Sequence, residues 1–496
     1  MLYSKTEPTK REIIEYMTRG LYHPLYREIP YNSPRKVYPY FSNKGSFLFE
    51  SVNGPEKIAR FSFIGFEPAM RIRIKNGITE IWQDDKVSVL QCRPLKKLSE
   101  ILDSYRQIPE ETLPPFQGGI AGLLSYDFVQ YLERLPRTTS DDLRIPDADL
   151  FLIDRLIAFD HINKKAWVIV CPGLRNNPIP AVSYDEAEYH LDRICNICNR
   201  ELAIGDYLNS WNLVMGNRGR KVEIIQEITK TEYMDMVKRA KEYIAAGDIF
   251  QANLSQRISA YINDTKPWDL YNVLSIINPS PFAGYIDFGD YYIVSSSPER
   301  LVRVRDRIIE TRPIAGTRPR GRDKREDEQM RDELLLNEKE RAEHIMLIDL
   351  ERNDLGKVSE YGTVEVDELM ITEDYSHVIH IVSNIRGQLA QGKDAIDAIR
   401  AVFPGGTITG VPKVRCMEII DELEPFQRGP YTGSMGYMGF SGNMDLNIII
   451  RTFVIKNGKA YVQAGAGIVA DSDPEREYYE TLKKAEALIS TLMQSY

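Results

Sequence analysis

Residues 337–356, NEKERAEHIMLIDLERNDLG, form a long helical pattern with one face that changes character along its length. If the segment is helical, positions i, i+3, i+7 and i+10 form a stripe that begins with two carboxylates and ends with two leucines: Glu340, Glu343, Leu347 and Leu350. Acids on a core-facing stripe need a cation or a metal ion, because burying an unpaired charge is costly. An incidental acid pair on a charged surface helix is the alternative.

A second segment near the C-terminus repeats this spacing. Residues 472–474, Ser-Asp-Pro, are a good helix start, and the helix that follows carries Glu477 and Glu480 at i and i+3, with Lys484 at i+7. Mg²⁺ prefers oxygen ligands, keeps several waters and takes others from an anionic substrate. Two such helices facing each other therefore predict a Mg²⁺ site built from Glu340, Glu343, Glu477 and Glu480.

The length of 496 residues exceeds what one core usually organises, which predicts two lobes or two closely packed domains. The best linker is Gly216–Arg220, so we divide the chain into residues 1–219 and 220–496. The net charge of −9, with both signs interspersed, argues against nucleic-acid binding. No leader-like or membrane-spanning apolar run is visible, so we expect a cytoplasmic protein.

Five cysteines, an odd number, indicate reduced thiols. Cys195 and Cys198 invite a zinc interpretation, but no second pair lies at a suitable spacing.

Alternating apolar residues and turn signals predict a β-rich first half and further strands in the second half. The expected strands include residues 46–51, 60–65, 70–74, 148–159, 166–170, 249–255, 285–297 and 301–311.

Several loop residues could contact a ligand. Glycines in Phe403–Gly410 precede a helix and would expose backbone N–H groups to an anion, unless they only form a tight connection. Gly465 and Gly467 allow close approach to a strand. Arg451, at the end of an apolar strand, must pair with an acid or bind an anionic substrate. Together these features predict a pocket for a small polycarboxylate with Mg²⁺.

Four blocks resemble the signatures of the chorismate-utilising enzymes: ETRPIAGTRPRG, NEKERAEHIMLIDLERNDLG, FPGGTITGVPKVRCMEIIDELEP and QAGAGIVADSDPEREYYETLKKA. The large subunits of anthranilate synthase and aminodeoxychorismate synthase are the most similar members. The resemblance is dense from Thr231 onward and thinner before it. It implies an α/β fold of the α+β type, with two large antiparallel sheets packed face to face and helices outside. It also implies that Mg²⁺ holds chorismate through its carboxylate.

The resemblance assigns roles to single residues. Glu299 matches the general acid that protonates the departing C4 hydroxyl, and His380 matches a histidine that assists the elimination of pyruvate. Gln251 and Thr407 are expected beside them in the catalytic set. The implied substrate contacts are Gly316, Thr317, Tyr431, Arg451, Gly465, Ala466, Gly467 and Lys484.

Position 251 distinguishes the nucleophile. Relatives that add water carry a lysine base there, whereas Gln251 is typical of members that use ammonia. This argues against a salicylate or isochorismate synthase. No glutamine amidotransferase module is recognisable, so we expect ammonia from a separate glutaminase subunit, or free ammonium.

The product is less constrained. Ala315 replaces a lysine that many aminodeoxychorismate synthases use covalently, which favours direct attack at C2, giving anthranilate and pyruvate for tryptophan synthesis. FPGGTITG and YTGSMGY instead resemble aminodeoxychorismate synthases, which aminate C4 for folate synthesis. The resemblance also implies a tryptophan site at Ser51, Pro281, Phe282 and Ala283, where a methionine usual in anthranilate synthases is missing. A non-catalytic chorismate- or tryptophan-binding homologue is the rival, and the intact acids oppose it.

Overall fold

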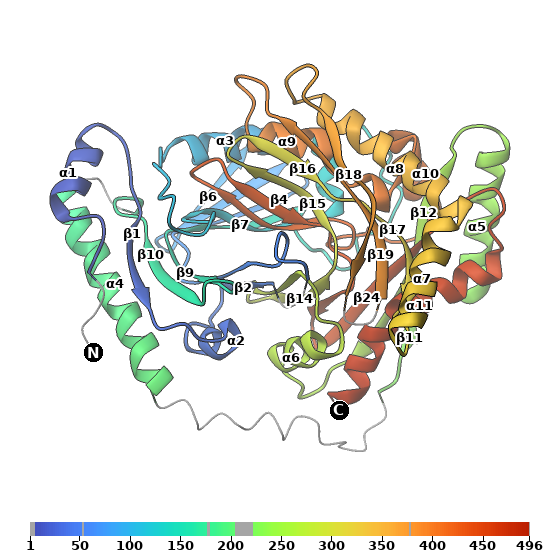
Figure 1. Cartoon of the computed structure of the whole chain (residues 1–496), viewed down its shortest axis with the longest axis horizontal. Coiled ribbons are helices and arrows are strands. Elements are labelled where there is room, and N and C mark those ends of the chain that lie inside the picture. Colours follow the sequence, from blue (N-terminus) through green and yellow to red (C-terminus); the bar gives the residue numbers. More distant parts are fainter. Residues whose placement is uncertain (1–4, 52–53, 176–178, 204–221, 376–377, 496) are drawn as a thin grey trace.

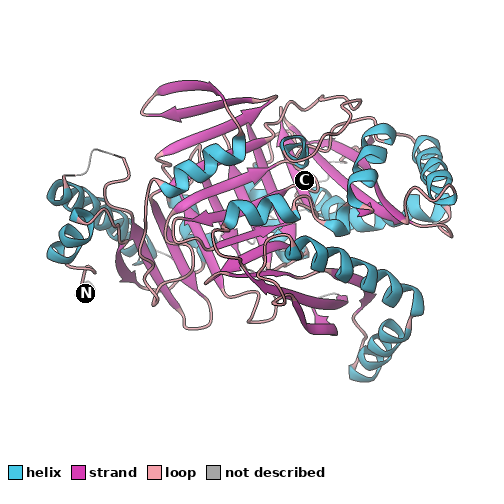
Figure 2. Cartoon of the chain, turned by 90° about the horizontal axis from the view of Figure 1, so that it is seen from above, coloured by secondary structure: helices cyan, strands magenta, loops and turns pink. Residues whose placement is uncertain are grey.

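The protein is built around two large antiparallel β-sheets with helices outside them, as Figures 1 and 2 show. This computed structural model describes residues 5–51, 54–175, 179–203, 222–375 and 378–495. The architecture confirms the predicted fold class. The predicted linker at 216–220, and with it the boundary at 219, lies outside the described residues.

The first sheet has twelve strands. Their order across the sheet is β1 (Leu25–Ile29), β10 (Lys165–Val170), β9 (Arg155–Asp160), β3 (Phe61–Gly65), β2 (Ser46–Glu50), β13 (Phe282–Asp287), β14 (Tyr291–Ser297), β23 (Thr452–Lys456), β24 (Lys459–Ile468), β12 (Gln251–Tyr261) and β11 (Ile225–Gln226). The short strand β20 (Gly410–Val411) also pairs with β12.

The second sheet also has twelve strands. Their order is β17 (Ile314–Pro319), β19 (Val378–Gln388), β16 (Ile308–Thr311), β15 (Arg300–Arg305), β22 (Met444–Asn447), β21 (Ser434–Gly439), β7 (Gly119–Leu124), β8 (Ala148–Ile153), β4 (Met70–Lys75), β5 (Ile78–Gln83) and β6 (Lys86–Gln91). β18 (Glu365–Asp374) pairs with β19.

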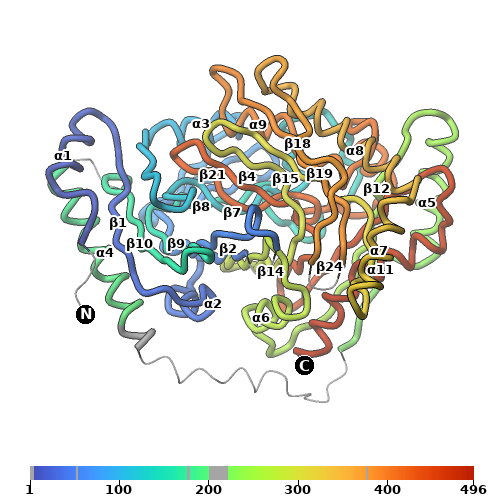
Figure 3. Tube along the Cα trace, in the orientation of Figure 1, coloured from blue at the N-terminus to red at the C-terminus, as the bar shows by residue number. Residues whose placement is uncertain are grey.

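Both sheets combine strands from the two halves of the chain. β2 pairs with β13 in the first sheet, and β7 pairs with β21 in the second. Figure 3 shows the blue N-terminal trace beside segments of much later colour. Residues before and after the predicted boundary therefore complete each other's sheets.

One hydrophobic core lies between the two sheets, and larger ones lie under the helices on their outer faces; this division follows from the two-residue period of the strands. Adjacent side chains of a strand point to opposite faces. Phe47 thus belongs to the cluster that also contains Phe151 and Tyr437 of the other sheet, whereas Leu48 packs in the outer cluster with helix side chains such as Leu488. This alternation gives each sheet one face for its partner and one for helices.

The helices are α1 (Lys10–Thr18), α2 (Pro34–Val37), α3 (Pro94–Asp103), α4 (Pro180–Ala203), α5 (Lys230–Ala245), α6 (Pro267–Ile277), α7 (Lys324–Leu336), α8 (Glu338–Gly356), α9 (Ala395–Val402), α10 (Lys413–Leu423) and α11 (Pro474–Gln494). Asn337 and Asp473 cap α8 and α11, each accepting a hydrogen bond from a backbone N–H of the first turn. Within the described ranges, none of the helices combines the length and hydropathy that a membrane span requires.

Two chain crossings between the sheets lie side by side. β14 of the first sheet continues almost directly into β15 of the second, and β22 leads into β23 through residues 448–451. The Ile448 N–H donates to the Glu299 carbonyl over 3.0 Å, and the Ser296 N–H donates to the Arg451 carbonyl over 3.1 Å. Glu299 and Arg451 are therefore held where the two sheets meet.

Candidate active site

The acidic helix α8 meets the start of β12 and the end of β24. Gln251 Nε2 donates a hydrogen bond to Glu343 Oε1, 2.8 Å away. Gly467 of β24 faces the same amide, because a Cβ at this position would collide with Gln251 Nε2. Glycine is therefore required here for a close approach, and it leaves open backbone beside the Gln251–Glu343 pair.

The other predicted carboxylate of α8 faces β17. Arg318 Nη1 donates to Glu340 Oε1 over 2.8 Å, while the buried Glu340 Oε2 has no hydrogen-bond partner among the described residues. Gly316 has a φ of +63°, and a Cβ there would lie 2.7 Å from Glu340 Oε2. A larger residue at Gly316 would displace this carboxylate.

Helix α11 presents the second pair of acids. Lys484 Nζ lies 2.8 Å from Glu480 Oε1 and donates to the Gly465 carbonyl over 3.1 Å. Burial raises the pKa of Glu477, and the neighbouring Glu480 raises it further, whereas Ser472 opposes the rise. The lysine thus ties α11 to the predicted ligand-binding end of β24.

The four predicted glutamates offer the kind of donor atom that Mg²⁺ prefers. All donors are carboxylate oxygens, and Glu340 Oε2 is an unpartnered buried acceptor. As the side chains stand, no three His, Cys, Asp or Glu groups in the described ranges are close enough to hold a metal ion. Glu343 and Glu480 are instead engaged by Gln251 and Lys484, so metal binding requires these carboxylates to exchange partners.

Glu299 is a buried carboxylic acid at the crossing between β14 and β15. Burial raises its pKa to about 7, against the opposing effects of the Thr407 hydroxyl and the Ile314 backbone N–H. Neither Glu299 Oε1 nor Thr407 Oγ1 forms a hydrogen bond of regular geometry within the described residues. A carboxyl group that keeps its proton near neutral pH is suited to general acid catalysis.

His380 of β19 lies beside β17. Its Nδ1 is 2.9 Å from Thr317 Oγ1 and 3.3 Å from the Gly316 carbonyl oxygen. Burial lowers the pKa of His380 to about 4, and the nearby Arg451 lowers it further, whereas the Gly316 carbonyl opposes this. The imidazole is therefore neutral at pH ~7, and a proton on Nδ1 donated to Gly316 leaves Nε2 able to act as a base.

Arg451 is a cation without a carboxylate partner in the described part of the chain. Burial lowers its pKa and Tyr431 opposes the change. Arg451 has a φ of +53°, which is uncommon for a residue with a side chain. Tyr431 reaches the end of β24, because a Cβ at Gly465 would lie 2.7 Å from its hydroxyl. The sequence left open whether Arg451 pairs with an acid or binds an anionic substrate. No acid pairs with it in the described residues, so the guanidinium is available to an anionic ligand.

The structure adds residues that the sequence did not single out. Arg318 binds Glu340, and Glu351 has a pKa that burial raises, with the charge of Glu299 adding to the rise. Glu351 could have been found, because it follows Leu347 by four residues on the buried face of α8. Ala466, by contrast, packs its side chain into a cluster with Leu254, so only its backbone can reach a ligand.

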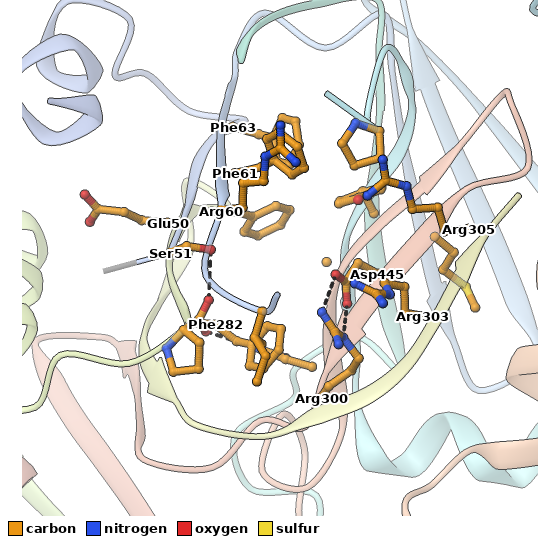
Figure 4. Close-up of a pocket in the computed structure, with 18 of the residues that line it drawn as sticks. Glu50, Ser51, Arg60, Phe61, Phe63, Phe282, Arg300, Arg303, Arg305 and Asp445 are labelled. Atoms are coloured by element: carbon orange, nitrogen blue, oxygen red, sulfur yellow. Dashed lines mark hydrogen bonds and ion pairs between the residues drawn. The ribbon is translucent and has the colours of Figure 1, made fainter. Parts of the chain in front are cut away.

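The residues predicted to bind tryptophan line a separate cavity of about 480 Å³, which Figure 4 shows. Ser51, Pro281, Phe282 and Ala283 all line it. Ser51 Oγ donates to the Pro281 carbonyl over 3.1 Å, and the Asn447 amide donates to the Phe282 carbonyl over 3.2 Å. Arg300 forms two hydrogen bonds with Asp445 on the opposite wall, 2.9 and 3.1 Å long. Arg300 directly follows Glu299, so the cavity and the buried acid are one residue apart along the chain.

The cysteines are buried or partly buried thiols. All five cysteines are free, and Cys195 and Cys198 are buried in α4. Burial raises the pKa of both thiols, which disfavours the thiolate that a metal needs.

Comparisons with known proteins show which family the chain belongs to. Residues 44–490 match the model of the chorismate binding enzyme family. The chain is 44% identical over 452 residues to anthranilate synthase component 1 of Acetivibrio thermocellus, covering 90% of each protein. It is 42% identical over 451 residues to aminodeoxychorismate synthase component 1 of Bacillus subtilis, covering 90% of this chain and 91% of that one.

A solved structure gives the same result. The crystal structure of anthranilate synthase component I from Streptococcus pneumoniae superposes with a TM-score of 0.77 at 36% identity, covering 88% of this chain and 92% of the other. The match spans most of both proteins, and the sequence identity over it exceeds one third. The chain therefore belongs to the chorismate binding enzyme family, as its four sequence blocks indicated.

Proposed function

We propose that this protein aminates chorismate with ammonia to give anthranilate and pyruvate. The observation that carries the proposal is Gln251, whose amide is hydrogen-bonded to Glu343 at the position where a base would activate water. Ammonia needs no such base. The nucleophile is delivered by a separate glutaminase subunit, in keeping with the component 1 names of the relatives, or enters as free ammonia.

The proposed roles follow from charge and burial. Arg451 binds a carboxylate of chorismate, because its guanidinium has no other anion in the described residues. Glu299 protonates the C4 hydroxyl as it leaves, and the neutral His380 accepts a proton during the elimination of pyruvate. Glu340, Glu343, Glu477 and Glu480 hold Mg²⁺, which when bound neutralises charge on the substrate carboxylate.

Aminodeoxychorismate formation, with ammonia entering at C4, is the second candidate. The Bacillus subtilis relative carries that name, and this chain is nearly as similar to it as to an anthranilate synthase component. Ala315 favours the first candidate, because its side chain is a buried methyl group on β17 that cannot form a covalent adduct with C2.

Product identification separates the two. Purified protein is incubated with chorismate, Mg²⁺ and ammonium at alkaline pH, and the products are separated with fluorescence and mass detection. We expect anthranilate with equimolar pyruvate. A product that keeps the enolpyruvyl group, and yields 4-aminobenzoate only after a lyase is added, would assign amination to C4.

We also propose that the cavity beside Ser51 binds tryptophan as an inhibitor. Its wall contains Phe49, Phe61 and Phe282 together with buried polar groups, which suits an aromatic amino acid. Ser51→Phe should fill the cavity and raise the tryptophan concentration for half inhibition by more than about tenfold. Activity titrations with tryptophan test this, and equal inhibition of both proteins would exclude the site.

A further inference from the structure

Glu424 and Arg428 form an ion pair that is almost completely buried, with 3% and 1% of their side chains exposed. Arg428 donates to both carboxylate oxygens, over 2.9 and 2.7 Å. A buried ion pair carries a desolvation cost that further hydrogen bonds must offset. The other contacts of the pair therefore show what it holds in place.

The carboxylate of Glu424 holds β12 at the predicted ligand-binding end of β24. Glu424 Oε1 accepts hydrogen bonds from the Ser255 N–H and from the Ser255 hydroxyl, each 2.8 Å long. Ser255 lies opposite Gly465 in the β12–β24 ladder. Gln463 Nε2 of β24 donates to the same hydroxyl over 2.8 Å. Both strands are thus joined to one carboxylate beside Gly465.

The guanidinium of Arg428 uses all five of its N–H groups within the protein. Two of them bind Glu424. Nη2 also donates to the Asn253 carbonyl over 2.7 Å, and Nη1 donates to the Ile408 carbonyl over 3.0 Å and to Thr432 Oγ1 over 3.3 Å. An arginine has five such donors, so none is left for a substrate. Arg428 can therefore act only through the residues that it holds.

Two residues in contact with Arg428 have side chains at Gly465. The guanidinium carbon lies 5.5 Å from the centre of the Tyr431 ring, which is within cation–π range. A Cβ at Gly465 would lie 2.7 Å from the Tyr431 hydroxyl and 2.5 Å from Asn253 Oδ1. Asn253 Oδ1 is buried and has no hydrogen-bond partner among the described residues. An unpaired buried polar atom beside a glycine is suited to a polar group of a ligand.

The N-terminal half of the chain also fixes the loop that carries Arg428. The Tyr126 N–H donates to the Gly429 carbonyl over 2.7 Å, and the Gly429 N–H donates to Asp127 Oδ2 over 2.8 Å. The centre of the Tyr126 ring lies 5.0 Å from the guanidinium carbon. These contacts leave the guanidinium little freedom, so the place of the Tyr431 ring depends on it.

We propose that Arg428 is a positioning residue that holds Tyr431 and Asn253 at Gly465 for chorismate, and that Asn253 is itself a substrate-binding residue. The inference rests on the proposed function and deepens it, because it states which side chains at this end of β24 contact chorismate and what aligns them. The Asn253 carboxamide has an N–H donor and a carbonyl acceptor, so it can bind either a carboxylate or the hydroxyl of chorismate.

Calorimetric titration with chorismate, at saturating Mg²⁺ and without ammonium, measures binding apart from turnover. Arg428→Lys keeps the charge opposite Glu424 but loses the planar fork, so the Kd for chorismate should rise about tenfold or more. Asn253→Ala removes an amide whose Oδ1 has no partner in the described residues, so it should raise the Kd about fivefold or more with little change in Tm. An unchanged Kd would overturn the positioning role in the first variant and the binding role in the second.

A double-mutant cycle shows whether Arg428 acts through Tyr431. Together, Arg428→Lys and Tyr431→Phe should raise the Kd by less than the product of their separate factors, because both affect the same hydroxyl contact. Factors that simply multiply would overturn the inference. Arg71→Lys is the matched control, since Arg71 of β4 forms a similar fork with Asp149, with two bonds of 2.8 Å, and β4 lies four strands from β22. This variant should bind chorismate like the wild type.

A variant without the two charges controls for folding. If Arg428→Lys lowers the Tm, Glu424→Gln combined with Arg428→Met should restore it, because replacing both partners leaves no unpaired buried charge. The Kd should stay raised, and a wild-type Kd in this double variant would show that the pair is purely structural. Wild-type chorismate binding without amination products would refute the proposed function, whereas weaker binding by Arg428→Lys would still support the positioning role.

Discussion

Glu299→Gln is expected to lower kcat on the order of 10³-fold while the KM for chorismate stays within about threefold. Glutamine has nearly the shape of the protonated acid and is neutral, so it preserves packing at the crossing of the sheets. It cannot give a proton to the departing hydroxyl. Steady-state kinetics with chorismate and ammonium measure both constants. A variant that keeps kcat and raises KM would show that Glu299 only binds substrate.

The pH dependence gives this prediction a second readout. At constant free ammonia, the wild-type kcat should fall as pH rises through about 7, because burial raises the pKa of Glu299 to about 7 and the acid must be protonated. Thr407→Val should move this limb to higher pH, since the Thr407 hydroxyl lowers the pKa. A limb that does not move would remove Thr407 from the catalytic set.

Thermal unfolding shows whether Glu299→Gln stays folded, and a variant at an exposed acid serves as the matched control. The folded pKa of Glu299 lies above its ordinary value of 4.5, so its contribution to the free energy of unfolding decreases as pH rises from 4.5 to about 7. Glu299→Gln lacks this decrease and should be at least as stable as the wild type above pH ~7. Asp306→Asn, with 84% of its side chain exposed at the β15–β16 turn, should leave kcat unchanged.

The sequence predicted the helices of the site well and the strand boundaries less well. The stripe of acids and leucines placed α8, and a cap with a first-turn proline placed α11, each within a residue or two. Residues 148–159 are one apolar run in the sequence, but the structure divides it into β8 and β9, which belong to different sheets. The break is at Asp154, which binds Arg175 through two hydrogen bonds of 2.6 and 2.7 Å. That pairing is tertiary, so a local pattern cannot reveal it.

Two hairpins also show that a local apolar pattern does not locate every strand end. Residues 285–297 and 301–311 were each expected to form one strand, and each is instead a hairpin with a tight turn. Helix periodicity placed Glu340 and Glu343 one turn apart on α8, because the signal lies within one helix. The burial of Glu299 arises from a crossing whose partner, Ile448, is far away in sequence. Its raised pKa therefore follows only from the assembled sheets.

Glu343→Gln is expected to weaken Mg²⁺ binding by about 100-fold or more, since even changes to residues behind metal ligands cost about 10–100-fold. A glutamine oxygen can still accept the hydrogen bond from Gln251 Nε2, so the packing of α8 on β12 should survive. The negative charge that a hard cation requires is lost. Glu480→Gln should behave in the same way, because it removes a carboxylate of α11 that pairs only with Lys484 in the described residues.

Calorimetric titration with Mg²⁺ measures binding directly, and turnover in a chelator measures dependence on the metal. Glu338→Gln is the matched control, since this exposed acid also lies in the first turn of α8 but not on the predicted stripe. It should bind Mg²⁺ like the wild type.

In the metal-free protein Glu343 and Glu480 are held by Gln251 and Lys484, so Mg²⁺ must displace these partners. Gln251→Ala should therefore tighten Mg²⁺ binding while Glu343→Gln weakens it. Full turnover in excess chelator, or equal Mg²⁺ affinity in all these proteins, would exclude the four glutamates as the metal site.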